Sequence, residues 1–172
     1  MAVEARKASA VTSADAGTPA KKNIVAGILK ETVGVVEVVN ADSIASTYRL
    51  ARVPSNARVS RVLVSCDAIT SAAADVGVYD VSAVNSGAAI DVDFFASAQP
   101  ISSALVHTDI THEADAADAG AGYGLADVEK PLWQALGLTA DPGKYYDIVA
   151  TLTAAAAATG TLSLKVQYVD GN

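Results

Sequence analysis

Short runs of β-branched and aromatic residues recur along the chain, and they indicate strands. The segment TVGVVEVV, residues 32–39, is dense in valine and favours an extended strand. STYRLARV and RVSRVLVSCDAI follow, and Pro54, Ser55 and Asn56 between them predict a short turn that joins the two runs in a hairpin. The second run has apolar residues on both parities, which is typical of a strand covered on both faces.

Two more pairs of segments predict hairpins. ADVGVYDV and DVDFFAS are separated by Asn85, Ser86 and Gly87, which are typical turn residues. YDIVATLT and TLSLKVQYV alternate apolar and polar residues on either side of the run AAAAA. Alanine has a high helix propensity, but the strand periods on both sides favour a final hairpin.

The region from Gln99 to Lys130 is irregular and predicts a long surface excursion with one strand near residues 104–110. PLWQALGL then predicts a short helix, with Pro131 in its first turn and Gly137 beyond its end. Seven or eight strands without a βαβ rhythm predict an all-β protein. We expect an antiparallel β-sandwich, jelly-roll-like or immunoglobulin-like, with one short helix.

The composition suggests one domain preceded by a flexible arm. A chain of 172 residues suits a single core. Residues 1–22 are rich in small and polar residues without a period, so we predict a flexible N-terminal arm there and a β-sandwich domain over residues 23–172. The 36 alanines each bury little area, so we expect neighbouring molecules to contribute to stability.

Charge is distributed unevenly. The formal net charge is −7, with +3 on residues 1–30 and −10 on the rest. Eleven acidic residues and no basic residue lie between Arg61 and Lys130. Such an acidic chain disfavours direct nucleic-acid binding. The basic arm suits contact with another copy of the chain or with another protein; alternatively, the arm is only a solvated tail. The candidate protein-contact residues are the basic ones of the arm and of one arginine-rich stretch: Arg6, Lys7, Lys21, Lys22, Arg49, Arg52, Arg58 and Arg61.

Patterns that carry catalysis are missing from the sequence. It contains no GxSxG, HExxH or P-loop motif, and Cys66 lies in an apolar strand pattern typical of a buried small side chain. Asp91 and Asp93 alternate on one strand face, which we interpret as the solvent side with Val92 and Phe94 inward. We therefore predict no catalytic, cofactor-binding or metal-binding residues.

The stretch HTDITHEADAADAG, residues 107–120, holds both histidines and four carboxylates. A metal site needs three or more ligands that converge on one ion. His107 and His112 are five residues apart, which points them to opposite faces of a strand. We interpret the stretch as an acidic surface loop, with a role at a subunit contact left open. No segment approaches 18 consecutive apolar residues, so we expect a soluble protein made in a cytoplasm, without membrane contact.

Several segments together resemble a known family. In order they are YRLARVPSNARVSRVLVSCDAI, ADVGVYD, DVDFFASAQPIS, PLWQALGL with DPGKYYDIVATLT, and TGTLSLKVQYV. Read as a whole, residues 47–170 resemble small structural proteins from the virions of tailed bacteriophages. The resemblance implies a non-enzymatic capsid decoration (cement) protein without cofactors, made in the host cytoplasm and placed on the capsid surface. Its implied partners are the major capsid protein and copies of itself.

Two other functions remain open from the sequence. One is a tail- or fibre-associated module that recognises a carbohydrate or another virion protein. Six tyrosines are available for a sugar platform, but most of them alternate with strand residues or adjoin turns, which favours packing. The other is a hydrolase that uses the acidic stretch at residues 107–120.

Overall fold

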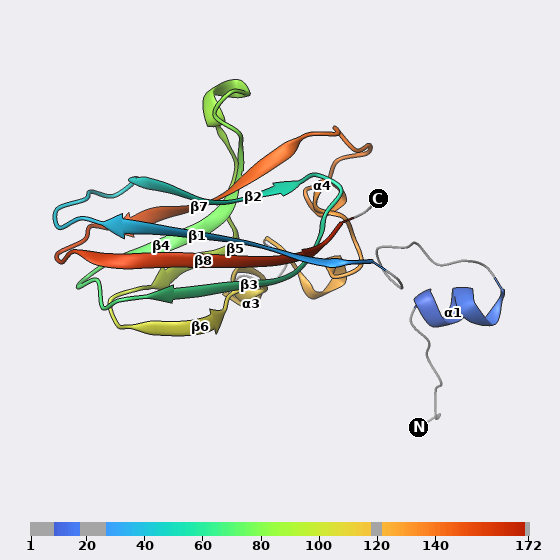
Figure 1. Ribbon diagram of the computed structural model, residues 1–172, viewed down its shortest axis with the longest axis horizontal. Coiled ribbons are helices and arrows are strands. Elements are labelled where there is room, and N and C mark those ends of the chain that lie inside the picture. The colour runs from blue at the N-terminus through green and yellow to red at the C-terminus, as the bar shows by residue number, and fades with distance from the viewer. Residues whose placement is uncertain (1–8, 18–26, 118–121, 171–172) are drawn as a thin grey trace.

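The computed structural model describes residues 9–17, 27–117 and 122–170, in which eight strands form two antiparallel sheets (Figure 1). The strands are β1 (Leu29–Val38), β2 (Thr47–Pro54), β3 (Arg58–Cys66), β4 (Ala73–Asp80), β5 (Ala89–Pro100), β6 (Leu105–Asp109), β7 (Tyr145–Ala154) and β8 (Gly160–Val169). The helical segments are α1 (Ser9–Asp15), α3 (Glu113–Ala117), α4 (Leu132–Ala135) and the 3₁₀ turns η1 (Asn85–Gly87) and η2 (Leu125–Asp127).

The chain crosses repeatedly between the two sheets. One sheet has the strand order β1-β8-β3-β6 and the other the order β2-β7-β4-β5. Among the strands of the described residues, only the consecutive pair β4 and β5 are hydrogen-bonded to each other. This arrangement is the eight-stranded jelly roll. The predicted all-β sandwich is therefore confirmed, and the jelly roll is the alternative that the chain adopts.

Two of the three predicted hairpins are wrong, whereas the β4–β5 hairpin is confirmed. The turn at Pro54, Ser55 and Asn56 carries the chain from one sheet to the other. The amide of Ser55 donates to the carbonyl of Lys144 (2.8 Å), and the amide of Trp133 donates to the carbonyl of Ser55 (3.0 Å). These bonds fix the turn against the start of β7 and against α4, so β2 and β3 separate.

The alanine run also connects the two sheets, between β7 and β8. The amide of Ala157 donates to Thr70 (2.9 Å), the amide of Ala156 donates to Asp42 (3.0 Å), and the carbonyl of Ala156 accepts from Ala41 (2.9 Å). These peptide groups form hydrogen bonds with other loops at the same end of the sandwich instead of the hydrogen bonds within a helix. The prediction that context overrides helix propensity is confirmed, but the predicted hairpin is wrong.

The short helix α4 closes one end of the sandwich, as the sequence predicts. Leu132 is fully buried, and its amide donates to the carbonyl of Ala57 (2.7 Å). Gly137 follows the helix with a positive φ of 77°, a conformation that glycine adopts without strain.

The stretch at residues 107–120 is more ordered than predicted. It begins on β6 and continues into α3, with residues 118–120 outside the described part of the chain. Ile110 and Thr111 are buried, and Thr111 Oγ1 accepts a hydrogen bond from the amide of Val62 (2.8 Å). Glu113 Oε2 accepts from the amide of Ser97 on β5 (2.7 Å). The interpretation of this stretch as a surface loop is therefore wrong for its strand, its helix and the buried residues between them, whose contacts join β3 of one sheet to β5 of the other.

Strand β5 is distorted, and this overturns one assignment of faces. The register between β4 and β5 shifts on both sides of Val76, and Phe94 and Phe95 are both buried. Val92 is exposed, not inward as predicted. Gly77 permits the distortion, since a Cβ there would lie 2.1 Å from the carbonyl oxygen of Asp91.

The edges of the two sheets meet at β1 and β2. Strand β1 pairs with β8 over ten residues without a shift in register. A Cβ on Gly34 would lie 1.8 Å from the carbonyl oxygen of Leu50, so the two backbones pass in direct contact at this point. The helix α1 falls within the predicted arm. Most of that arm, residues 1–8 and 18–22, lies outside the described residues, so its boundary and flexibility stay predictions.

Candidate protein-interaction surface

The four clustered arginines lie on two different sheets. Arg49 and Arg52 are on β2, whereas Arg58 and Arg61 are on β3. The predicted turn between them is a crossing between sheets, so the sequence cluster does not form one surface. The other predicted contact residues, Arg6, Lys7, Lys21 and Lys22, lie outside the described residues.

Arg49 is held by acceptors within its own chain. Its Nη1 donates to the carboxylate of Asp147 (3.0 Å) and to the carbonyl of Asp80 (2.9 Å), and its Nη2 donates to the carbonyl of Gly87 (2.6 Å). The guanidinium also lies 5.7 Å from the ring centroid of Tyr79. This arginine fastens β2 to β7, β4 and η1, which is a structural role.

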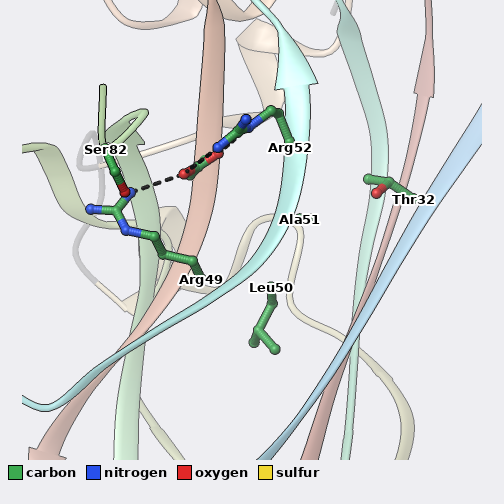
Figure 2. A pocket seen from close by; sticks show the side chains of 7 residues that line it. Thr32, Arg49, Leu50, Ala51, Arg52 and Ser82 are labelled. Atoms are coloured by element: carbon green, nitrogen blue, oxygen red, sulfur yellow. Dashed lines mark hydrogen bonds and ion pairs between the residues drawn. The ribbon is translucent and has the colours of Figure 1, made fainter. Parts of the chain in front are cut away.

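Arg52 forms a two-pronged ion pair with the same carboxylate. Its Nε lies 2.7 Å from Asp147 Oδ1 and its Nη2 lies 3.1 Å from Oδ2. The side chain of Asp147 is only 4% exposed, whereas that of Arg52 is 57% exposed. Figure 2 shows the two guanidinium groups converging on one carboxylate. Two positive charges therefore share one buried negative charge, and the excess charge lies on the solvent side.

A surface cleft of about 360 Å³ opens beside this cluster. It is lined by both arginines, by Leu50 and Ala51 between them on β2, by Thr32 of β1, by Asp147 of β7 and by Ser82, which follows β4 (Figure 2). We call it the arginine cleft. Hydroxyl and guanidinium groups are hydrogen-bond donors, so the cleft suits an anionic group such as a carboxylate.

The arginines of β3 make weaker contacts. Arg61 Nε lies 3.2 Å from Asp109 Oδ2, and both side chains are about half exposed. Arg58 Nη1 donates to the carbonyl of Val128 (3.2 Å). The exposed pair of Arg61 and Asp109 contributes little to stability. The contact role of Arg58 and Arg61 stays a prediction from the sequence.

Three carboxylates gather at the opposite edge of the β2-β7-β4-β5 sheet. Asp75 lies on β4, and Asp91 and Asp93 lie on β5; we call these three the acidic edge. Burial raises the pKa of Asp91, and a side-chain hydrogen bond with Asp93 and then the charge of Asp93 raise it further. Burial, and then the charge of Asp93, also raise the pKa of Asp75. Among the described residues, no lysine or arginine forms an ion pair with any of the three.

The edge strand β1 exposes a row of apolar side chains that the sequence analysis did not identify. Leu29, Val33 and Val35 alternate along the strand, and each is more than half exposed. The sequence did contain a signal for this row, because residues 32–39 are apolar at both odd and even positions. Only one of these two sets can face the core, so the other is exposed. Exposed apolar rows of this kind mark contact surfaces or aggregation risks.

Groups with potential chemistry are spread apart or buried. Burial raises the pKa of the Cys66 thiol, which makes it a poor nucleophile. His107 is exposed on β6, whereas His112 stacks on Tyr123 and its Nδ1 lies 2.8 Å from the Tyr123 carbonyl. Among the described residues, no three His, Cys, Asp or Glu side chains are placed to hold a metal ion. Within the same part of the chain, no helix is long and apolar enough to cross a membrane.

Comparison with known proteins gives structural likeness only. No family model matches the chain, and no curated protein matches it. A chain in the structure titled "Cyanophage Pam1 capsid asymmetric unit" is similar with a TM-score of 0.52 and 17% identity, over 84% of this chain and 86% of that one. A chain in the structure titled "Capsid of Ralstonia phage GP4" is similar with a TM-score of 0.56 and 14% identity, over 86% and 88%. At these identities the likeness concerns the fold.

Proposed function

We propose that this chain is a non-enzymatic virion structural protein that binds the outside of a bacteriophage head and stabilises it as a decoration (cement) protein. The observation that carries the proposal is the jelly roll, which is shared over most of both chains with proteins in two phage capsid structures. In this proposal the partners are the major capsid protein and further copies of the chain.

The surface supports a protein that functions in an assembly. The apolar row on β1 leaves three large aliphatic side chains exposed on an edge strand. A protein that worked alone would gain by replacing them with polar residues, because exposed apolar edges promote association. Burial of this row against a capsid subunit would remove apolar area from water, with a favourable free energy.

The carbohydrate-binding alternative has less support. Sugar sites of β-sandwich proteins present exposed aromatic rings, and all six tyrosines lie in the described part of the chain. Of these six, only Tyr145 is exposed. One exposed ring does not make a platform, and a glycan array would test the point directly.

Particle composition tests the proposal. Virions of the phage that encodes this chain are purified on a density gradient and examined by mass spectrometry and electron cryomicroscopy. We expect many copies per particle, with density on the outer surface of the head. Purified particles without this chain would refute the proposal, and density confined to the tail would favour the alternative.

A binding assay tests the contact surface. Purified protein is added to heads that lack it, and bound protein is counted after sedimentation. We expect a double change Val33→Thr and Val35→Thr to weaken binding, because it removes apolar area from β1 and keeps strand-forming residues. The matched control is Val106→Thr, at an apolar position on the other edge of the same sheet that is 80% exposed, against 55% for Val33 and 66% for Val35. Equal binding by the β1 variant and the control would exclude β1 as the contact.

A further inference from the structure

The β2-β7-β4-β5 sheet carries opposite charges at its two edges. The arginine cleft extends from Arg49 and Arg52 on β2 to Ser82, which follows β4, and the acidic edge lies on β4 and β5. In the described part of the chain, no ion pair joins the two features. A second copy of the chain offers each edge its complement.

The cationic side has charge left over after its internal bonds are made. Arg49 uses three acceptors of its own chain, and Arg52 uses Nε and Nη2 on Asp147. The two positive charges face one carboxylate, and Arg52 remains 57% exposed at the cleft. A further carboxylate placed in the cleft would balance the charge and accept hydrogen bonds from the rest of the guanidinium.

The anionic side has no balancing cation in the described part of the chain. Asp91 and Asp93 lie two residues apart on β5, and the amide of Asp93 donates to Asp91 Oδ1 at 3.4 Å. The charge of Asp93 also contributes to the raised pKa of Asp75 on β4. No cation of the described residues pairs with them. The approach of a guanidinium group relieves this repulsion, so the acidic edge gains more from a cationic partner than a single exposed carboxylate does.

We propose that the arginine cleft of one copy binds the acidic edge of a second copy, in a head-to-tail contact between the two edges of equivalent sheets. The contact joins two different surfaces, so it is heterologous and its repetition closes a ring or extends a filament. The inference rests on the proposed function, because it describes how copies of a decoration protein associate with one another.

Self-association of the full chain tests the contact. Sedimentation velocity at low salt gives the dissociation constant of the wild type and of Ser82→Glu, which places a carboxylate in the cleft at an exposed position. We expect the dissociation constant of this variant to rise by about tenfold or more. The matched control is Ser82→Gln, which has the same size without the charge and should associate like the wild type.

A complementary pair of variants tests which surface is the partner. Asp93→Lys is expected to associate weakly by itself. A mixture of Asp93→Lys with Ser82→Glu is expected to recover association, because the new Lys meets the new Glu while the unchanged cleft meets the unchanged acidic edge. Urea denaturation of each variant establishes that the fold is retained.

The outcomes separate this contact from the proposed function. A monomeric wild type at low salt, or equal association of Ser82→Glu and Ser82→Gln, overturns the contact even if the chain is found in virions. Particles without the chain overturn the proposed function even if the charge-dependent association is measured. Loss of head binding without loss of self-association in Ser82→Glu would assign the cleft to the capsid protein and also overturn the contact.

Discussion

Replacement of Asp147 by alanine should destabilise the fold far more than the loss of an exposed ion pair. The carboxylate is 4% exposed and accepts hydrogen bonds from two guanidinium groups, at 3.0 Å from Arg49 and at 2.7 and 3.1 Å from Arg52. The variant leaves both cations beside each other without the charge that holds them. Removal of one partner of a buried pair costs about 3–5 kcal/mol.

The magnitude expected here is smaller, because the arginines are partly solvated. The side chains of Arg49 and Arg52 are 31% and 57% exposed, so water replaces part of the lost interaction. We expect the free energy of unfolding to fall by about 2–3 kcal/mol. For a domain of this size, that decrease lowers the melting temperature by about 5–10 °C.

Urea denaturation, followed by circular dichroism, measures the difference, and the control is Arg61→Ala. The side chain of Arg61 is 56% exposed, similar to the 57% of Arg52, but its partner Asp109 is 48% exposed, whereas Asp147 is 4% exposed. Its loss should cost less than about 0.5 kcal/mol. Equal destabilisation by Asp147→Ala and Arg61→Ala would show that burial of the shared carboxylate does not determine the magnitude. An Arg52→Ala, Asp147→Ala double-mutant cycle then measures the coupling between the two groups.

Three further perturbations test other parts of the structure. Gly34→Ala should lower the free energy of unfolding by about 1–3 kcal/mol, because the Cβ of the new alanine would collide with the backbone of β2. The control Val35→Ala, on the exposed face of the same strand, should lower it by less. Urea denaturation compares the two variants, and equal values would contradict the close approach of β1 and β2. Asp91→Asn should stabilise the protein at pH 7. The pKa of Asp91 is raised in the folded state, so the contribution of this group to folding stability is fully present below its unfolded pKa and is lost as pH rises through its folded pKa. At pH 7 the charged Asp91 therefore destabilises the fold, and a neutral asparagine removes this cost. Melting curves should therefore differ at pH 7 and converge near pH 3, about one unit below the unfolded pKa, and a constant difference would exclude this cause. Tyr123→Phe should lower the free energy of unfolding by about 1–2 kcal/mol, because the buried carbonyl of Val59 on β3 loses its hydrogen-bond donor. Tyr145→Phe, at an exposed site, should cause no measurable change. Urea denaturation measures both, and similar changes would show that the hydrogen bond does not contribute to stability.

Local patterns predicted the elements better than their pairing. The strand periods, the turn at residues 85–87 and the helix begun by Pro131 were readable because each depends on residues close in sequence. Pairing of β2 and β3 was misjudged, because Pro54, Ser55 and Asn56 suit both a hairpin and a crossing between sheets. The bonds that decide between them come from Lys144 and Trp133, far along the chain.

The candidate site was predicted only in part. Arg49 and Arg52 were singled out from charge alone, but their joint partner Asp147 lies 98 and 95 residues away. The ordered packing of Thr111 was not predicted for the same reason, because its partner is also far away in the sequence. Its hydroxyl accepts the hydrogen bond of the Val62 amide, in the place of a carbonyl of a neighbouring strand. Tertiary partners of this kind leave no local period in the sequence, so pattern analysis does not detect them.

The pairing of the first strand with the last has a mechanical consequence. Leu29 lies opposite Val169, and the antiparallel ladder of β1 and β8 runs from there for ten residue pairs. The chain therefore enters and leaves the sandwich side by side, next to the ion pair between Lys30 and Asp170. Tension between these two points loads one pair of residues at a time and opens the ladder like a zipper. Tension between Val38 and Val169, at opposite ends of the same ladder, would instead load all ten pairs in shear and require a much larger force.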